Sequence, residues 1–325
     1  MMSELRVMTW NVENLFEPEA ADGPGARTEF EAKIESLAAV IDQAKPHVVA
    51  LQEIGSESAL TRLSSQLTHT MPHQLVGVPD GRGIAVAFLS QRVLGDRVDI
   101  AQFPAGMLPV QSGDDPPGPA GPATMNGLSR DALQVTIRAG GRDVHVVSCH
   151  LKSKLLTFPG GRFSPDDEDQ RARVAAYALY RRTAEATTLR THLNELLAGT
   201  GREAAVVLAG DLNDEVDAAT TQIFNGPPGS EIGTAGFALP DGGDGDRMWN
   251  LAPKIPAKER FSRRYRGRNE LIDHIFVSHH LGTRTRSART LTAQTHLPSI
   301  TDDPGEQRGS PGSDHSAVVA TFELE

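Results

Sequence analysis

Short runs of small and apolar residues alternate with polar segments along the chain, and several of these runs stop at a polar side chain. In the clearest case, the small and apolar residues 204–209 lead to Gly210, and Asp211 and Asn213 follow. The run is typical of a buried strand, and Gly210 permits a sharp turn at its end. Alternate side chains of a strand share a face, so Asp211 and Asn213 are expected to point the same way. Such a pair can orient a water and hold an oxyanion, although an Asx turn explains the same residues.

The same periodicities predict most of the other elements. Alternation and apolar runs predict strands, and apolar residues spaced three or four apart predict helices. Helices are expected over 28–45 and 164–199, with Thr28 and Ser164 as N-terminal caps, and a shorter helix over 56–69. Strands are expected over 5–11, 47–53, 83–90, 97–103, 129–138, 143–151, 204–211, 271–277, 285–295 and 313–322.

Residues 104–128 differ from the rest, because 11 of these 25 residues are Pro or Gly. Such a stretch has no periodicity of its own, so we expect a long loop. Two interpretations remain open, a mobile flap near a functional site and a disposable insertion. The chain shows no internal repeat and no shift in composition, and we therefore expect residues 1–325 to form a single domain.

Composition narrows the class of protein. The 325 residues are 38% hydrophobic and 23% charged, which is typical of a folded core. Apolar runs such as 84–89 are too short to cross a bilayer, and residues 1–6 lack an apolar signal core, so we expect a cytoplasmic location. The single cysteine, Cys149, rules out an internal disulfide. The net charge of -10 argues against tight non-specific binding of nucleic acid but leaves room for a local basic groove.

Polar residues that bear chemistry recur at the ends of the predicted strands. Any one of them is weakly informative, because buried strands often end in a polar turn residue. Six such endings are hard to explain as turns, and carboxylates with an amide oxygen suit Mg²⁺ or Mn²⁺ better than Zn²⁺. The endings are Asn11, Glu53, His150, Asp211 with Asn213, Asp273, and Asp314 with His315.

These residues lie in motifs that resemble those of the endonuclease/exonuclease/phosphatase family, which includes DNase I, abasic-site endonucleases and neutral sphingomyelinases. The motifs occur in the family's order and span almost the whole chain, so the set is specific. The resemblance implies a four-layer α/β sandwich, in which two mainly antiparallel sheets pack face to face between helices. It also implies one active site where the strand ends of both sheets meet. The matching segments are 9–12, 51–53, 148–153, 210–214, 272–275 and 313–316.

The resemblance implies a site that holds Mg²⁺ or Mn²⁺. Glu53 is the implied principal ligand, and Asn11 and Asp314 are implied to lie near the metal. Lys152 follows the strand predicted over 143–151 and is a candidate for binding substrate.

Five further residues are implied to act on the substrate. Asp211 is similar to the residue that positions or deprotonates the attacking water, and Asn213 to its phosphate-oxygen partner. His315 resembles the His that contacts the scissile phosphate, with Asp273 holding its ring. His150 is a candidate acid for the leaving group, although the sequence does not place its usual carboxylate partner.

These roles imply a phosphodiester hydrolase in which catalysis consists mainly of positioning and of stabilising charge on phosphoryl oxygens. We expect a monomeric nuclease, endo- or exo-acting, with DNA or RNA as substrate. The alternative is a phosphodiesterase or phosphatase acting on a phospholipid head group or another small phosphoester. A non-catalytic scaffold of the same fold would predict a missing acid or His, and none is missing. His-rich binuclear phosphoesterases are disfavoured, because 210–214 brings no His.

Six of the eleven residues at 258–268 are basic. This stretch leads into the strand that carries Asp273, so it is expected to end near the site. One interpretation is an edge strand kept soluble by its arginines, with its aromatic side chains packed inward. The other is a groove wall in which Arg263 or Arg264 grips phosphates beside the scissile one.

Overall fold

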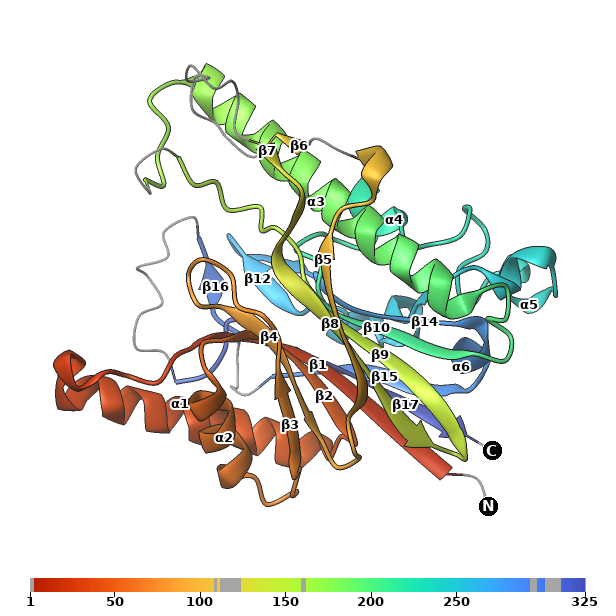
Figure 1. Ribbon diagram of the computed structural model, residues 1–325, viewed down its shortest axis with the longest axis horizontal. Helices are drawn as coiled ribbons and strands as arrows, with labels where there is room; N and C mark the ends of the chain where they lie inside the picture. The colour runs from red at the N-terminus through yellow and green to blue at the C-terminus, as the bar shows by residue number, and fades with distance from the viewer. Residues whose placement is uncertain are drawn as a thin grey trace.

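The computed structural model describes residues 3–107, 110–111, 124–158, 162–292, 297–301 and 311–324, and two six-stranded sheets lie face to face in it (Figure 1). The first sheet contains β1 (Ser3–Leu15), β2 (Val48–Ile54), β3 (His73–Val76), β4 (Ala85–Ser90), β15 (Thr285–Leu291) and β17 (Ala317–Leu324), in the order β15-β17-β1-β2-β4-β3. The second contains β5 (Gly95–Gln102), β8 (Gly127–Ala139), β9 (Arg142–His150), β10 (Ala205–Asp211), β11 (Trp249–Asn250) and β14 (Asp273–Val277), in the order β11-β14-β10-β9-β8-β5. Neighbouring strands are antiparallel, apart from the parallel pairs β1–β2 and β9–β10.

Two smaller sheets accompany these. One has the order β13-β12-β16, with β12 at Arg263–Tyr265, β13 at Arg268–Glu270 and β16 at Ser299–Ile300. The other pairs β6 (Val110–Gln111) with β7 (Thr124–Met125).

Alternation along the strands divides the apolar residues between a central core and two outer ones. On β1, Leu5 and Val7 belong to the cluster between the sheets, whereas Met8 and Trp10 belong to the cluster under the first sheet's helices. The same division holds along residues 205–209 of β10. Both faces of each sheet are therefore covered, which explains why these strands read as nearly continuous apolar runs.

Helices cover the outer faces of both sheets. α1 (Gly23–Ala44) and α2 (Glu57–Gln66) lie on the first sheet, and α3 (Glu168–Leu197) lies on the second (Figure 1). The four-layer α/β sandwich expected from the resemblance is confirmed. The remaining helical turns are α4 (Ala219–Gln222), α5 (Ala235–Ala238), α6 (His279–Thr283), η1 (Ala20–Asp22), η2 (Ala105–Met107), η4 (Gly242–Gly245), η5 (Ala252–Lys254) and η6 (Ala257–Glu259). None of the helices in the described ranges combines the length and apolar character needed to cross a lipid bilayer.

Both predicted helix caps were wrong. Thr28 lies inside α1, which begins at Gly23 after Asp22. The first turn of α1 contains a Pro, which has no backbone N–H to leave unpaired. The helix can therefore begin there without a capping side chain. Ser164 precedes α3 by several residues, and the cap is Asp167, whose side chain accepts a hydrogen bond from the backbone N of Gln170 (2.7 Å). The run of acids after Ser164 offered several equivalent caps.

Three further expectations need correction. β3 was not predicted, because its four half-buried residues show no clear alternation. The last strand begins at Ala317, so Asp314 and His315 precede it. β12 is the central strand of its small sheet, which excludes the edge-strand interpretation of the basic stretch.

The Pro/Gly-rich loop predicted at 104–128 falls mostly on residues 108–109 and 112–123, which lie outside the described residues, and its end belongs to β7 and β8.

Candidate active site

The predicted site residues lie where the inner faces of both sheets change from apolar to polar. Asn11 continues the inner face of β1, and Asp211 ends that of β10. Just beneath them, Gln52 donates hydrogen bonds to Thr9 Oγ1 (3.2 Å) and to Ser148 Oγ (3.3 Å). This buried polar layer joins β1 and β2 of the first sheet to β9 of the second, and it separates the apolar core from the site.

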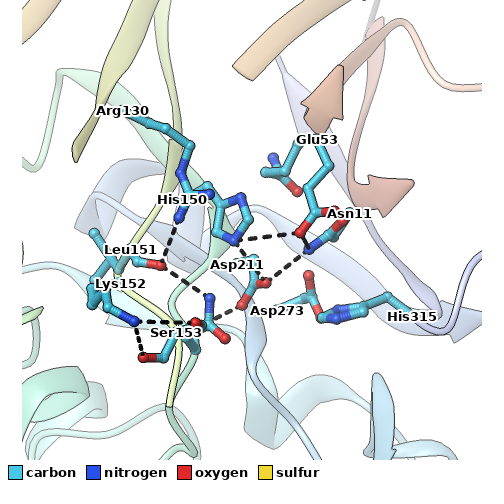
Figure 2. A network of polar contacts seen from close by, with 12 residues as sticks. Asn11, Glu53, Arg130, His150, Leu151, Lys152, Ser153, Asp211, Asp273 and His315 are labelled. Carbon is cyan, nitrogen blue, oxygen red and sulfur yellow. Dashed lines mark hydrogen bonds and ion pairs between the residues drawn. The ribbon is translucent and has the colours of Figure 1, made fainter. Parts of the chain in front are cut away.

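Asp211 lies at the centre of the cluster (Figure 2). Its Oδ2 accepts a hydrogen bond from Asn11 Nδ2 (3.0 Å) and lies 3.5 Å from His150 Nε2. Its Oδ1 accepts from the backbone N of Asn213 (2.7 Å). Burial and the charge of Asp273 raise the pKa of Asp211 to about 6. A carboxylate in this range can accept a proton near neutral pH.

His315 and Asp273 form a buried dyad beside Asp211. Nδ1 of His315 lies 2.7 Å from Oδ2 of Asp273, and the carboxylate fixes the ring's orientation. Burial alone would lower the pKa of His315, but Asp273 and Asp314 outweigh it and raise the pKa well above its ordinary 6.5. The ring is therefore an imidazolium at neutral pH, and its Nε2 is a charged donor.

Glu53 enters the cluster from the first sheet through an irregularity in β2. The pairing register with β4 shifts between Leu51 and Ile54, and Glu53 has φ of +65°. A positive φ is uncommon for a residue with a side chain, and a bulge of this kind re-aims the side chain. Its Oε1 accepts from Asn11 Nδ2 (3.2 Å) and its Oε2 from the backbone N of Asn14 (2.9 Å).

Asn213 is held against the segment that follows β9. Its backbone also has a positive φ of +53°, and its amide Nδ2 donates to the carbonyl of Leu151 (3.0 Å). One N–H of this amide is thus committed to the backbone, and the other N–H and Oδ1 are the groups left for a substrate. Asp211 and Asn213 are thus neighbours across a turn, in which the backbone N of Asn213 donates to Asp211.

His150 faces the acids through Nε2, which lies 3.9 Å from Glu53 Oε1 as well as near Asp211. Burial and the guanidinium of Arg130 hold the pKa of His150 well below 6.5, so the ring is neutral at pH 7. Nδ1 has no hydrogen-bond partner within the described part of the chain. The sequence did not identify the carboxylate that usually partners this His, and no carboxylate of the described residues bonds to Nδ1.

An excess of negative charge gathers at the Glu53 side of the cluster. Oε2 of Glu13 accepts a hydrogen bond from the backbone N of Asp314 (3.2 Å), and Lys33 Nζ lies 3.6 Å from the same carboxylate. Burial and Asp314 raise the pKa of Glu13 to about 7, and burial also raises the pKa of Asp314. Together with Glu53, these carboxylates fit a divalent cation, because oxygen ligands suit hard cations and a bound cation would offset their repulsion.

A second group of possible ligands overlaps with the first. Asp211, Asp273 and His315 each offer one ligand atom, and these atoms all lie within 4.8 Å of one another. His315 would have to lose its proton to bind a metal there, so the carboxylates near Glu53 fit a divalent cation better.

Glu13 and two residues of α3 belong to the site's surroundings, and sequence reasoning missed them. Arg182 Nε donates to Asp214 Oδ2 (3.1 Å), and its Nη1 donates to the carbonyl of Lys152 (3.0 Å). Glu185 accepts from the backbone N of Lys152 (2.6 Å). The helix thus fixes the segments that follow β9 and β10, on which His150 and Asp211 depend. Charged residues inside a helix normally indicate a solvent-exposed face, so the pattern gave no signal of this role.

The two predicted substrate-binding residues lie on segments that adjoin residues of the cluster. Lys152 Nζ donates to the carbonyls of Ser153 (3.1 Å) and Leu155 (3.0 Å), and burial lowers its pKa to about 8. Arg264 lies in the middle of β12, half-buried, opposite Asn269 and Ser299. Its neighbour Arg263 is the residue of β12 that pairs with His315.

Two packed sheets with a buried cluster of acids and imidazoles at their common end define a phosphoesterase fold. The model of the Endonuclease/Exonuclease/phosphatase family matches residues 8–315, and the chain belongs to this family. A comparison with curated proteins finds no match.

Solved structures share the fold at low sequence identity. Truncated Caenorhabditis elegans TDP2 is 16% identical with a TM-score of 0.56, and the likeness covers 99% of this chain and 98% of that one. The human Nocturnin catalytic domain with bound sulfate anion is 16% identical with a TM-score of 0.55, covering 99% and 95%. D. rerio TDP2 complexed with single strand DNA product is 16% identical with a TM-score of 0.55, covering 98% and 99%.

Proposed function

We propose that the protein is a divalent-metal-dependent phosphodiester hydrolase that acts as a nuclease. The observation that carries this proposal is the position of Asp211. Its Oδ2 lies between Asn11 and His150, and the dyad of Asp273 and His315 lies alongside. Asp211 is the base, Asn11 and His150 are two further donors, and His315 is a charged donor. These groups converge on one point, as in-line attack of water on a phosphate requires.

In this mechanism Asp211 orients the attacking water and accepts its proton, for which its raised pKa is suited. The imidazolium of His315 and the amide of Asn213 stabilise charge on the phosphoryl oxygens. A divalent cation held by Glu53, Asn11 and Asp314 would neutralise charge that develops during the transfer. His150 donates a hydrogen bond from its neutral ring toward the leaving oxygen.

The role of His150 can be separated from the others by the leaving group. His150→Ala is expected to lower kcat on a nucleotide diester by about 10²-fold to 10⁴-fold. The loss should be much smaller on bis-p-nitrophenyl phosphate, because p-nitrophenolate leaves without needing a proton. Steady-state rates on the two substrates measure this difference. Equal losses on both would remove His150 from the leaving-group role.

The surface beside His315 supports a polynucleotide as substrate. The guanidinium of Arg263 lies 5.0 Å from the centre of the Tyr265 ring, and that of Arg266 lies 5.6 Å from it. The backbone of Ser316 also donates to the carbonyl of Ser262 (2.6 Å), so this cationic and aromatic strand is tied to the site. Arg264 lies between these residues and is proposed to contact a flanking phosphate. Arginine with aromatic rings along a backbone track is typical of nucleic-acid binding.

A panel of substrates with Mg²⁺ tests the proposal. Single-stranded DNA or plasmid is expected to be hydrolysed with kcat/KM about 10²-fold above that of bis-p-nitrophenyl phosphate, because binding of the rest of the polymer contributes to catalysis. The KM for DNA should rise with salt, because phosphate contacts release counterions. Hydrolysis of sphingomyelin vesicles with no cleavage of DNA or RNA would reject the nuclease and favour a lipid phosphodiesterase.

A further inference from the structure

The residue that follows β1 presents an exposed aromatic ring next to the site. Phe16 is 40% exposed, whereas most large apolar side chains of the described residues are buried. Its ring lies directly on the backbone of Gly55, since a Cβ added to Gly55 would be 2.3 Å from Cδ1 of the ring. Gly55 is two residues beyond Glu53, so the ring packs on the segment that follows Glu53. A residue with any side chain at 55 would displace it.

The ring's position is fixed by backbone hydrogen bonds on both sides. The backbone N of Phe16 donates to the carbonyl of Asn14 (2.9 Å), and that of Gly55 donates to the carbonyl of Leu15 (2.9 Å). Asn14 in turn donates to Glu53 (2.9 Å). One face of the ring is covered by the Gly55 backbone, and its exposed part can take a second flat group. A preformed ring of this kind loses little freedom when a ligand stacks on it.

The chain segment next to this ring carries a cationic side chain. A Cβ added to Gly83 would be 3.6 Å from Cε1 of Phe16, and the preceding residue, Arg82, has a side chain 68% exposed. Arg82 forms an ion pair with Asp80 (3.3 Å), and Asp80 lies 3.7 Å from Arg130, which donates to the carbonyl next to His150 (3.4 Å). Arg82 is therefore at the rim of the same pocket.

Two acids near Phe16 in the sequence each have a cationic partner. Glu17, the residue after Phe16, lies 3.0 Å from Arg27. Glu13 has Lys33 at 3.6 Å. The rim thus combines a flat apolar surface with an accessible cation.

We propose that Phe16 is a nucleobase-stacking subsite, with Arg82 contacting the phosphate that flanks the stacked base. This inference rests on the proposed nuclease function and specifies which part of the substrate binds there. Every base has a π face, so such a subsite accepts any sequence. With the arginines of β12 next to His315, the substrate would cross the site as a single strand that both surfaces contact.

The test compares two oligomers that differ only in their bases. One is a short single-stranded oligothymidylate, and the other carries tetrahydrofuran residues in place of the nucleosides that flank the scissile phosphate. Phe16→Ala is expected to raise KM on the first by about tenfold and on the second by less than twofold, with little change in kcat. Phe16→Trp should keep the wild-type KM, and Phe16→Leu should behave as the alanine variant does. Arg82→Ala should raise KM on both oligomers alike, because both retain their phosphates.

Leu239→Ala is the matched control. Leu239 is 65% exposed and follows α5, where Phe237 packs on Trp249 at the Val277 end of β14, away from Asp273. It should change neither KM. Equal rises in KM on both oligomers with Phe16→Ala, or none on either, would overturn the subsite while leaving the nuclease intact. Failure of the wild type to cleave either oligomer would reject the nuclease itself. So would a Phe16→Ala variant that loses activity on phospholipid vesicles alone.

Discussion

Exhaustive chelation with EDTA is expected to abolish hydrolysis, and Mg²⁺ or Mn²⁺ should restore it. The physical reason is the concentration of partly buried carboxylates at Glu13, Glu53 and Asp314, where burial and the neighbouring acids raise the pKa of Glu13 to about 7 and also raise that of Asp314. Without a cation, charge on the phosphoryl oxygens would develop next to these acids. The loss should be on the order of 10³-fold or more. Rates during a titration with Mg²⁺ measure it.

Two variants separate metal binding from catalysis. Glu53→Gln should raise the Mg²⁺ concentration needed for half-maximal activity far more than Asp273→Asn does, because Asp273 bonds to His315. Mg²⁺ should also raise the Tm of the wild type more than that of Glu53→Gln, since a ligand that binds the folded state stabilises it. Full activity after complete removal of divalent cations would reject the metal-dependent mechanism.

His315→Ala is expected to lower kcat by about 10²-fold to 10⁴-fold on every substrate, good and poor leaving groups alike. In the proposed mechanism the imidazolium acts at the phosphoryl oxygens, which all phosphodiesters share. The fold should persist, because Trp10 Nε1 donates to the backbone carbonyl of His315, which the substitution retains (2.8 Å). Thermal unfolding checks this. A loss that depends strongly on the leaving group would assign His315 a different role.

Asp273→Asn gives the same dyad a pH signature. Burial lowers the pKa of His315, and the charges of Asp273 and Asp314 raise it by more. Removing the charge of Asp273 therefore lowers the pKa of His315, and the ring loses its proton at a lower pH. Activity of the variant should fall off earlier as pH rises than activity of the wild type does. An unshifted alkaline limb in the pH–kcat profile would contradict this.

The strand ends were predictable because the signal is local. Along β10 the apolar run and Gly210 lie within a few residues of Asp211, and the alternation of side chains decides which of them face the other sheet. Alternation likewise predicted the facing of Asn11, but the strand end predicted there was wrong, because β1 continues to Leu15. Helix caps were less predictable, because several residues near each start were chemically equivalent and tertiary packing selects among them. Asp167 and Ser164 illustrate this ambiguity.

Contacts between distant segments were not predictable. Glu13 meets the backbone of Asp314 across 301 residues, and Glu185 meets Lys152 across 33. Nothing in the pattern around Glu13 or Glu185 distinguishes it from a solvated acid. The positive φ of Glu53 was also hidden, because the apolar run of β2 continues to Ile54 as if the strand were regular. These features depend on how the sheets approach each other.

β17 lies between β1 and β15, and this position has a consequence for how the protein is made. Ser3 pairs with Leu324 and Thr9 with Val318, so β1 presents an unpaired edge during synthesis until β17 has emerged. An open edge beside apolar side chains can pair with another chain and aggregate. The segment that closes this edge also brings Asp314 and His315 to the site. Pairing of β17 therefore closes the edge and completes the candidate site in one step.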